Sequence, residues 1–435
     1  MFGGLLRTTS LAALLAAGMA FGGASAKAAD LGGDCCADLE ERVAELEATT
    51  ARKGNRKVSL TVSGWVNEAM MFWDDGVESN IYQATNVVAQ TRFRFVGSAK
   101  INDEWSAGYL LEVGIRGAGS DQTNANVDDG TAPNSLAIRH SAWWLNSKRL
   151  GKVWVGQTSA ATDGIMEINL ANTGHFATQN AGAQVGSFVV QGSGLTLRQY
   201  MGGTATGNTA AQIGEGERLN VVKYESPSIQ GFTLAAAYGE DDMWDVALRY
   251  AGEFSGFKLA MGVGYMQWTD GNNLASDFGC GFAASPSADN DCTQIGVSGA
   301  IMHVPTGLYA HAAYGIRSDD NIGAPGDDES TQLYIQAGIE QKFFPLGKTT
   351  IFGEYQTWEI GSTNTAAMKG DPAAFTLTNT GSREMTMWGI GLNQNIEAAA
   401  MDLYIRYNNF EPDDLDATTA EETFQSVIMG GKINF

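Results

Sequence analysis

Positive charge is scarce in this chain of 435 residues, which has 27 Lys and Arg against 49 Asp and Glu and a formal net charge of −22. Proteins that bind nucleic acid need a basic surface to neutralise phosphates, so this balance excludes nucleic acid as a partner. Long apolar runs are also missing after residue 24, although 44% of the residues are hydrophobic. A membrane helix needs roughly 18 apolar residues in succession. The apolar residues are instead dispersed by alternation, as in a sheet that is wet on one face.

Histidine is rare too, and the four histidines share no metal-ligand spacing. No His-Glu-x-x-His, phosphate-loop or dinucleotide-binding pattern is present. The sequence therefore predicts no enzyme, no cofactor and no metal centre. Pairs of aspartates such as Asp74-Asp75 and Asp327-Asp328 leave one alternative open. They are either a solvated acidic exterior or ligands for divalent cations, because paired carboxylates are hard oxygen ligands.

Only four cysteines occur, in two local pairs. Cys280 and Cys292 flank a stretch rich in Gly, Ala, Ser and Asp, which predicts a loop disulfide formed in an oxidising compartment. Cys35 and Cys36 are adjacent and cannot easily bridge within one chain. They are either free thiols or disulfides between protomers.

The first 28 residues have the pattern of a secretory signal peptide, with Arg7 ahead of an apolar stretch and small residues at the expected cleavage site. The following segment, 29–56, carries Leu39, Val43 and Leu46 at heptad spacing among glutamates. Two heptads are marginal alone, but three copies held together by a trimer could form a short periplasmic coiled coil. The alternative is a disordered acidic linker.

From about residue 57 onward the hydrophobicity alternates with a period of two. One example is 257–265, where Phe257, Leu259 and Met261 share one face while Lys258 and Ala260 share the other. Such segments fit strands with one face toward lipid and one toward water. Sixteen of them can be counted, and single-chain bacterial barrels have an even number. They cover approximately 58–73, 87–100, 104–117, 136–146, 150–157, 217–226, 231–239, 243–252, 255–269, 292–303, 307–317, 330–343, 347–360, 382–395, 399–411 and 423–435.

The connections between these segments alternate between short and long, as short periplasmic turns and long extracellular loops do. The one exception is the short connection near 240–242. The final segment ends with Gly431, Ile433 and Phe435 on one face, a pattern that resembles the signal read by the barrel-insertion machinery. Aromatic residues near strand ends are typical of interfacial girdles. They are Phe72, Trp73, Trp105, Trp268, Phe343, Phe344 and Trp358.

Several stretches resemble the general diffusion porins of Gram-negative outer membranes, and the N-terminal extension resembles that of the alphaproteobacterial branch. The matching stretches are 58–67, Thr91–Gly97, Gly151–Gln157 and Arg218–Pro227. The resemblance covers 57–435 and implies an all-β, 16-stranded antiparallel transmembrane barrel in the outer membrane. It also implies a homotrimer that contacts outer-membrane lipids including lipopolysaccharide.

In these porins the third extracellular loop folds inward and narrows the lumen, and the resemblance places 158–216 in that role. Acidic loop residues then face arginines on the barrel wall. By position, the wall arginines are Arg92, Arg139 and Arg218, and the loop acids are Asp163 and Glu167. A basic residue expected on the first strand is absent, and Trp65 lies near its place. Strand parity adds further lumen candidates, Arg94, Glu112 and Arg116.

Sixteen strands leave an aqueous channel where eight would be filled by side chains. The function predicted is therefore passive diffusion of small hydrophilic solutes and ions across the outer membrane. Two alternatives remain at this stage. One is a substrate-specific channel, and the other is a barrel with a secondary structural role in tethering the outer membrane.

Overall fold

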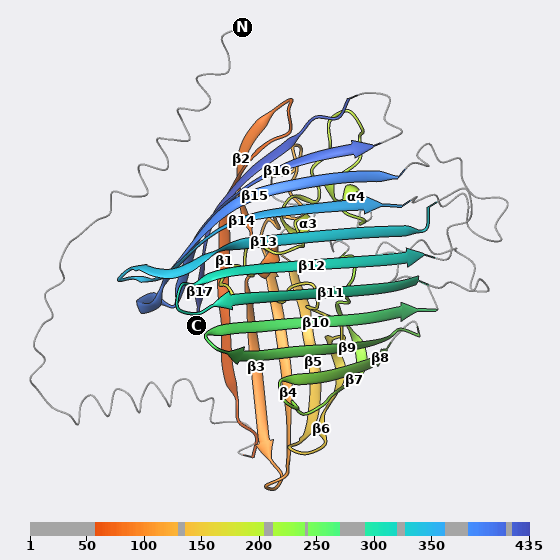
Figure 1. Ribbon diagram of the computed structural model, residues 1–435, viewed down its shortest axis with the longest axis vertical. Helices are drawn as coiled ribbons and strands as arrows, with labels where there is room; N and C mark the ends of the chain where they lie inside the picture. Colours follow the sequence, from red (N-terminus) through yellow and green to blue (C-terminus); the bar gives the residue numbers. More distant parts are fainter. Residues whose placement is uncertain are drawn as a thin grey trace, which may run out of the picture. The chain divides into compact units, whose positions relative to one another are not determined.

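The computed structural model describes residues 57–128, 135–203, 212–239, 242–269, 292–319, 327–361, 382–414 and 420–435, all within the unit Lys53–Phe435 (Figure 1). The predicted signal peptide, the predicted heptads of 29–56, Cys35, Cys36 and Cys280 lie outside these residues. No helix among the described residues is both long and apolar enough to span a membrane.

The described chain forms one antiparallel sheet that closes on itself, because β1 pairs with β17 as well as with β2 and β3. The strands are β1 (Thr61–Asp74), β2 (Ser79–Thr85), β3 (Arg92–Lys100), β4 (Trp105–Arg116), β5 (Ser135–Ser147), β6 (Gly151–Ser159), β7 (Arg218–Glu225), β8 (Phe232–Gly239), β9 (Trp244–Phe254), β10 (Phe257–Trp268), β11 (Cys292–His303), β12 (Leu308–Asp319), β13 (Glu329–Phe344), β14 (Gly347–Ile360), β15 (Arg383–Ile396), β16 (Met401–Asp414) and β17 (Phe424–Asn434).

Seventeen segments make sixteen spanning strands, because β2 and β3 follow one another along the same edge of β1. Glu68–Asp74 of β1 pairs with β2, and Thr61–Trp65 pairs with β3. Between them lies the short 3-10 helix η1 (Val87–Ala89). The predicted fold, a closed 16-stranded antiparallel barrel, is therefore confirmed. The second spanning strand begins earlier than the alternation indicated and is interrupted at 86–91.

Burial alternates along the strands as the period of two predicted. In β12 every second residue is buried, and in β14 Phe352, Glu354 and Gln356 are buried while Ile351 and Tyr355 are exposed. The exposed set is largely apolar and forms the belt that faces lipid. Buried residues point into the barrel, which makes the inner face polar with local apolar clusters.

Three of the aromatics assigned to an interfacial girdle lie inside the barrel instead. Trp73, Trp268 and Trp358 are each at most 3% exposed. They share the parity of inward-facing neighbours, so the strand period turns them away from lipid. Phe343 and Phe344 are more than half exposed, as a girdle position requires.

The chain end completes the barrel wall. The backbone amide of Phe435 donates to the carbonyl oxygen of Gly64, and the amide of Gly64 donates to the carbonyl of Phe435, both at 3.0 Å. The side chains of Ile433 and Phe435 are exposed on the outer face, while Gly431 pairs with Leu403 and Glu68. The role of these residues as an insertion signal stays a prediction.

Cys292 begins β11, is fully buried and is disulfide-bonded. Its predicted partner, Cys280, lies outside the described residues, so the pairing itself stays a prediction. All turns at one rim of the barrel are short, for example 255–256 between β9 and β10 and 345–346 between β13 and β14. The longer connections lie at the other rim, and the longest of them is 160–217.

Candidate functional site

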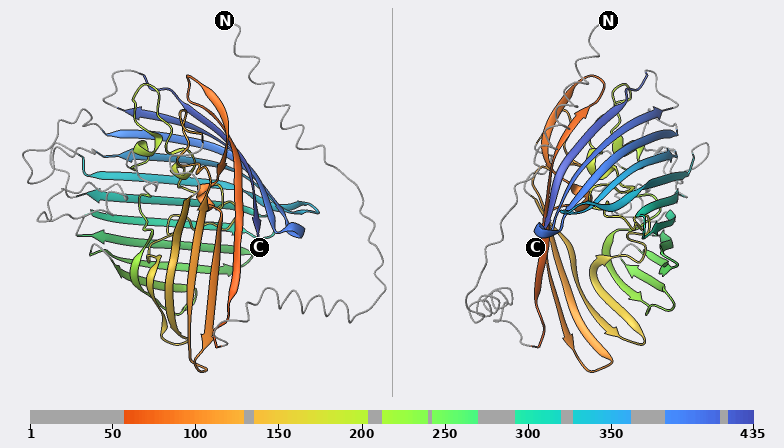
Figure 2. Two further views of the ribbon diagram at one scale, coloured as in Figure 1. Left: turned by 180° about the vertical axis from the view of Figure 1, so that it is seen from behind. Right: turned by 60° about the vertical axis from the view of Figure 1, so that its left-hand side comes forward.

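The connection between β6 and β7 runs inside the ring of strands (Figure 2). It contains two single-turn helices, α3 (Gly182–Val185) and α4 (Leu197–Tyr200). Its apolar side chains are buried against the inner wall. Phe176 stacks on Tyr404 with ring centroids 4.7 Å apart, and Phe188 packs against Trp73 at 5.0 Å. The connection is therefore held in place by apolar contacts with the barrel wall rather than by regular secondary structure.

Polar contacts fasten the same loop to β13–β16. Arg406 on β16 is 1% exposed, pairs with Glu354 of β14, and donates to the carbonyl oxygen of Phe176 and the side chain of Gln184. Glu354 also accepts from the Tyr334 hydroxyl at 2.8 Å. A buried charge survives only when it is paired and hydrogen-bonded, so this network fixes the first half of the loop to one side of the lumen.

Glycines on adjacent strands let the returning half of the loop approach the wall closely. Gly296 and Gly315 pair with each other across β11 and β12. A Cβ at Gly296 would be 1.9 Å from the carbonyl oxygen of Gly214, and one at Gly315 would be 2.2 Å from that of Ile213. Only glycine fits such an approach. The loop therefore occupies the side of the lumen lined by β9–β17 and β1, and it leaves the side lined by β3–β7 open.

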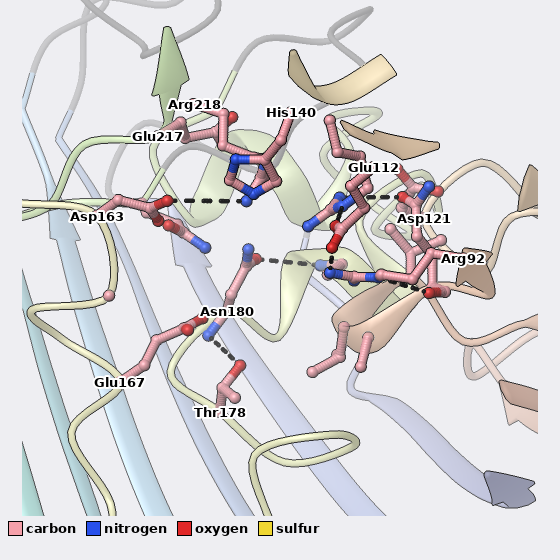
Figure 3. Close-up of a pocket in the computed structure, with 18 of the residues that line it drawn as sticks. Arg92, Glu112, Asp121, His140, Asp163, Glu167, Thr178, Asn180, Glu217 and Arg218 are labelled. Atoms are coloured by element: carbon pink, nitrogen blue, oxygen red, sulfur yellow. Dashed lines mark hydrogen bonds and ion pairs between the residues drawn. The ribbon is translucent and has the colours of Figure 1, made fainter. Parts of the chain in front are cut away.

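A cavity of about 370 Å³ remains between the loop and that open side (Figure 3). It is charged on both walls. Its lining includes five arginines, Arg92, Arg94, Arg116, Arg139 and Arg218, and five carboxylates, Glu112, Asp121, Asp163, Glu167 and Glu217. The formal charges of these ten side chains therefore sum to zero, but the positive and negative charges lie at different places on the cavity wall.

Glu112 on β4 lies at the centre of the basic wall and is 1% exposed. It pairs with Arg92 of β3 at 3.0 Å, with Arg94 at 2.7 Å and with Arg139 of β5 at 2.8 Å. A bulge in the pairing of β4 with β5 next to Glu112 lets Arg139 and His140 both project inward. One carboxylate thus holds three guanidinium groups together, and two positive charges are left in excess.

Trp65 on β1 supports this wall from the side. The guanidinium of Arg92 lies 4.5 Å and that of Arg94 5.2 Å from the centre of its ring, and the ammonium of Lys432 lies 4.9 Å away. Its indole N–H donates to the carbonyl oxygen of Ala89 at 3.0 Å, which fixes the ring. Where a basic residue was expected on the first strand, the chain has instead an aromatic platform for cations from two neighbouring strands.

The opposite wall belongs to the loop. Asp163 lies 3.9 Å from Arg218 of β7, and its backbone carbonyl accepts from Arg249 at 2.8 Å. Glu167 is exposed to the lumen but enclosed by protein. This enclosure, together with the nearby carboxylate of Asp163, raises the pKa of Glu167 to about 7. The arginines of the facing wall oppose the rise without cancelling it.

The structure places all five residues predicted for the constriction, and the three further lumen candidates, around this one cavity. They come from β3, β4, β5, β7 and the loop. Asp121 and Glu217 were not singled out from the sequence. Asp121 pairs with Arg116 at 3.3 Å, but it lies in a loop, where no period indicates its direction. Among the described residues, no group of three or more His, Cys, Asp or Glu side chains is arranged to hold a metal ion.

A closed barrel with an apolar belt outside, and an inward loop that leaves a charged passage inside, defines the class of membrane-spanning β-barrel channels. The family model for Gram-negative porins matches residues 10–415 of this chain. The chain belongs to the Gram-negative porin family, and it forms a diffusion channel in the outer membrane.

Solved structures with the same fold support this assignment at the level of architecture. The chain is similar to an anion-selective porin from Comamonas acidovorans, with a TM-score of 0.54, 14% identity, and 87% of this chain and 100% of that chain covered. It is also similar to the trimer form of OmpT from Vibrio cholerae (0.51, 14%, 87% and 99%) and to the channel DcaP of Acinetobacter baumannii (0.51, 13%, 88% and 99%). No curated protein sequence matches the chain.

Proposed function

We propose that the basic wall and the loop carboxylates form the constriction that sets which ions pass through this porin. The observation that supports this most directly is the separation of charge across one cavity. Arg92, Arg139 and Arg218 project from the strands, whereas Asp163 and Glu167 project from the loop that faces them. Charges so placed produce a transverse field in a passage whose low-dielectric walls reduce screening. Small hydrophilic solutes diffuse through without energy input, without a cofactor and without chemical conversion.

Neutralising the loop acids tests this proposal. In a channel with Asp163→Asn and Glu167→Gln, the positive wall is left less opposed, so the reversal potential in a salt gradient should move toward that of an anion-selective pore. The measurement is made on purified protein in planar bilayers. Glu397→Gln is the matched control, because Glu397 lies in a short turn at the rim and pairs with Lys342 in solvent. An unchanged reversal potential in the double variant would contradict the proposed constriction.

Selectivity should also depend on pH near neutrality. A carboxyl with a pKa of about 7 is mostly charged at pH 8 and mostly protonated at pH 6. As the pH falls through this range, Glu167 loses its negative charge and the pore should become more permeable to anions. Glu167→Gln should be less sensitive to pH over the same interval. An equal pH dependence in both proteins would contradict the assignment to Glu167.

We also propose that the functional form is a homotrimer embedded in outer-membrane lipids including lipopolysaccharide and delivered by the barrel-insertion machinery. Support comes from the family and from the trimer form of OmpT. The purified protein should migrate as a trimer in mild detergent and shift to the faster-migrating band of the unfolded monomer on boiling. Light scattering that gives a monomer mass in mild detergent would contradict this proposal.

A further inference from the structure

A second cluster of lysine and tryptophan lies on the lumen wall away from the constriction. The ammonium of Lys152 on β6 is 3.9 Å from the centre of the Trp154 ring and 4.5 Å from that of Trp144 on β5. The two rings are 6.3 Å apart and inclined by 60°, so the ammonium lies in the corner between them. Trp144 and Trp154 are direct partners in the pairing of β5 with β6.

Strand parity turns this cluster into the lumen. The adjacent residues Trp143 and Val153 are 55% and 37% exposed on the outer face, so Trp144, Lys152 and Trp154 point inward. The ring of Trp144 lies against the backbone at Gly108, where a Cβ would be 2.3 Å from a ring carbon. The glycine thus lets the indole lie close to the barrel wall. Both indoles stay partly exposed, which leaves aromatic surface open to a solute.

The charge of Lys152 is only partly offset by Glu225, which lies opposite it in the pairing of β6 with β7. The carboxylate of Glu225 pairs with Lys223 at 2.9 Å and accepts from the indole N–H of Trp154 at 3.1 Å. Within the part of the chain that the structure describes, no carboxylate lies at ion-pair distance from Lys152. Two lysines and one glutamate leave one net positive charge, held in position by two rings.

The cluster lies on the path of a solute that has passed the arginines. Thr158 of β6 contacts His140 of the cavity at 3.2 Å. Trp154 is four residues closer to the short turn that joins β5 and β6, or about 13 Å along the strand at 3.3 Å per residue. Short turns mark the periplasmic rim of such barrels. An anion that leaves the constriction toward the periplasm therefore passes the level of Lys152.

We propose that Lys152, Trp144 and Trp154 form a binding site for small carboxylates that carry an aromatic ring. The ammonium attracts the carboxylate, and the partly exposed indoles offer surface on which a ring can pack. A simple inorganic anion would use only the first of these contacts. The inference requires only that the barrel is an open channel, and it does not rest on the roles proposed for the arginines.

The test is solute block of single-channel current, with benzoate, acetate or benzyl alcohol added to the periplasmic side at millimolar concentration and constant ionic strength. Benzoate should reduce the wild-type current several-fold more than acetate or benzyl alcohol. Lys152→Gln and Trp154→Ala should lose most of this difference, while Trp154→Phe should retain part of it. Lys258→Gln is the matched control, because Lys258 is an exposed lysine near the same rim, on a strand separated from β6 by three others.

Conductance in potassium chloride alone shows that each variant still forms an open pore, so a loss of block cannot come from misfolding. Equal block of wild type and Lys152→Gln would overturn the proposal, as would equal block by acetate and benzoate. If the block is instead lost in Arg139→Gln and kept in Lys152→Gln, benzoate binds at the constriction and the second site is refuted.

Discussion

A channel with Arg92, Arg139 and Arg218 all replaced by glutamine should change from its native selectivity to a clear preference for cations. Two opposite charges 4 Å apart interact by about 1 kcal/mol even in bulk water. Removing three positive charges from one cavity should therefore lower the permeability ratio of chloride to potassium by about tenfold in 0.1 M salt. The effect should shrink at 1 M, where the Debye length is roughly 3 Å. Reversal potentials in a salt gradient measure it directly.

The triple replacement leaves Arg94 paired with Glu112 at 2.7 Å, so that buried carboxylate keeps one partner. The matched control replaces the same three residues with lysine, which keeps the charge but loses the planar donor arrangement of arginine. Lysine variants should stay close to the native selectivity. If the glutamine and lysine channels have the same reversal potential, the selectivity of this pore does not arise from the basic wall.

Replacing Arg406 with methionine should destabilise the protein and loosen the loop together. Arg406 is buried, and its loss leaves the Glu354 carboxylate without its cation and two loop acceptors without their donor. Breaking a buried pair in this way costs about 3–5 kcal/mol. The free energy of unfolding from reversible urea denaturation should fall by that amount. Single-channel recordings should show added current noise as the loop samples positions away from the wall.

Two further variants separate these effects. Lys342→Met breaks an ion pair with Glu397 in which both side chains are about half exposed, and such a pair contributes less than about 1 kcal/mol. The double variant Arg406→Met with Glu354→Leu removes the unpaired buried carboxylate. It should therefore recover part of the stability, but its single-channel current should stay as noisy as that of Arg406→Met. If the current noise of Arg406→Met equals that of the wild type, the loop is held in place without this network.

Much of the architecture could be predicted from the sequence because a strand repeats every two residues. That period placed Arg92, Arg94 and Glu112 on the inner face, and the register of neighbouring strands then brought them together. The same period also gave the correct direction for Trp73, which shares its face with Met71 and Asn67. The girdle assignment was wrong for Trp73, because the parity of a residue decides which face of the strand it occupies even close to the strand end.

The loop could be predicted only in outline. The resemblance to porins implied that 158–216 folds inward, and the length of the connection agreed with a functional role. What fastens it depends on partners more than 160 residues away, such as Gln336 for Asn169 and Asp402 for Asn172. No local pattern encodes such pairs. Trp65 was noted only as the residue at an expected basic position, since a contact with arginines on β3 is not visible along β1.

The position of the inner loop constrains the order in which the protein can assemble. Residues 160–217 precede β10–β17 in the chain, yet they pack against the inner surface of those later strands. The barrel closes only when β17 and the terminal Phe435 join β1. The enclosed segment carries three buried aromatic rings, Phe176, Phe188 and Tyr200, and several buried polar groups. The inner surface that holds the loop is therefore complete only when the last strands have joined the sheet.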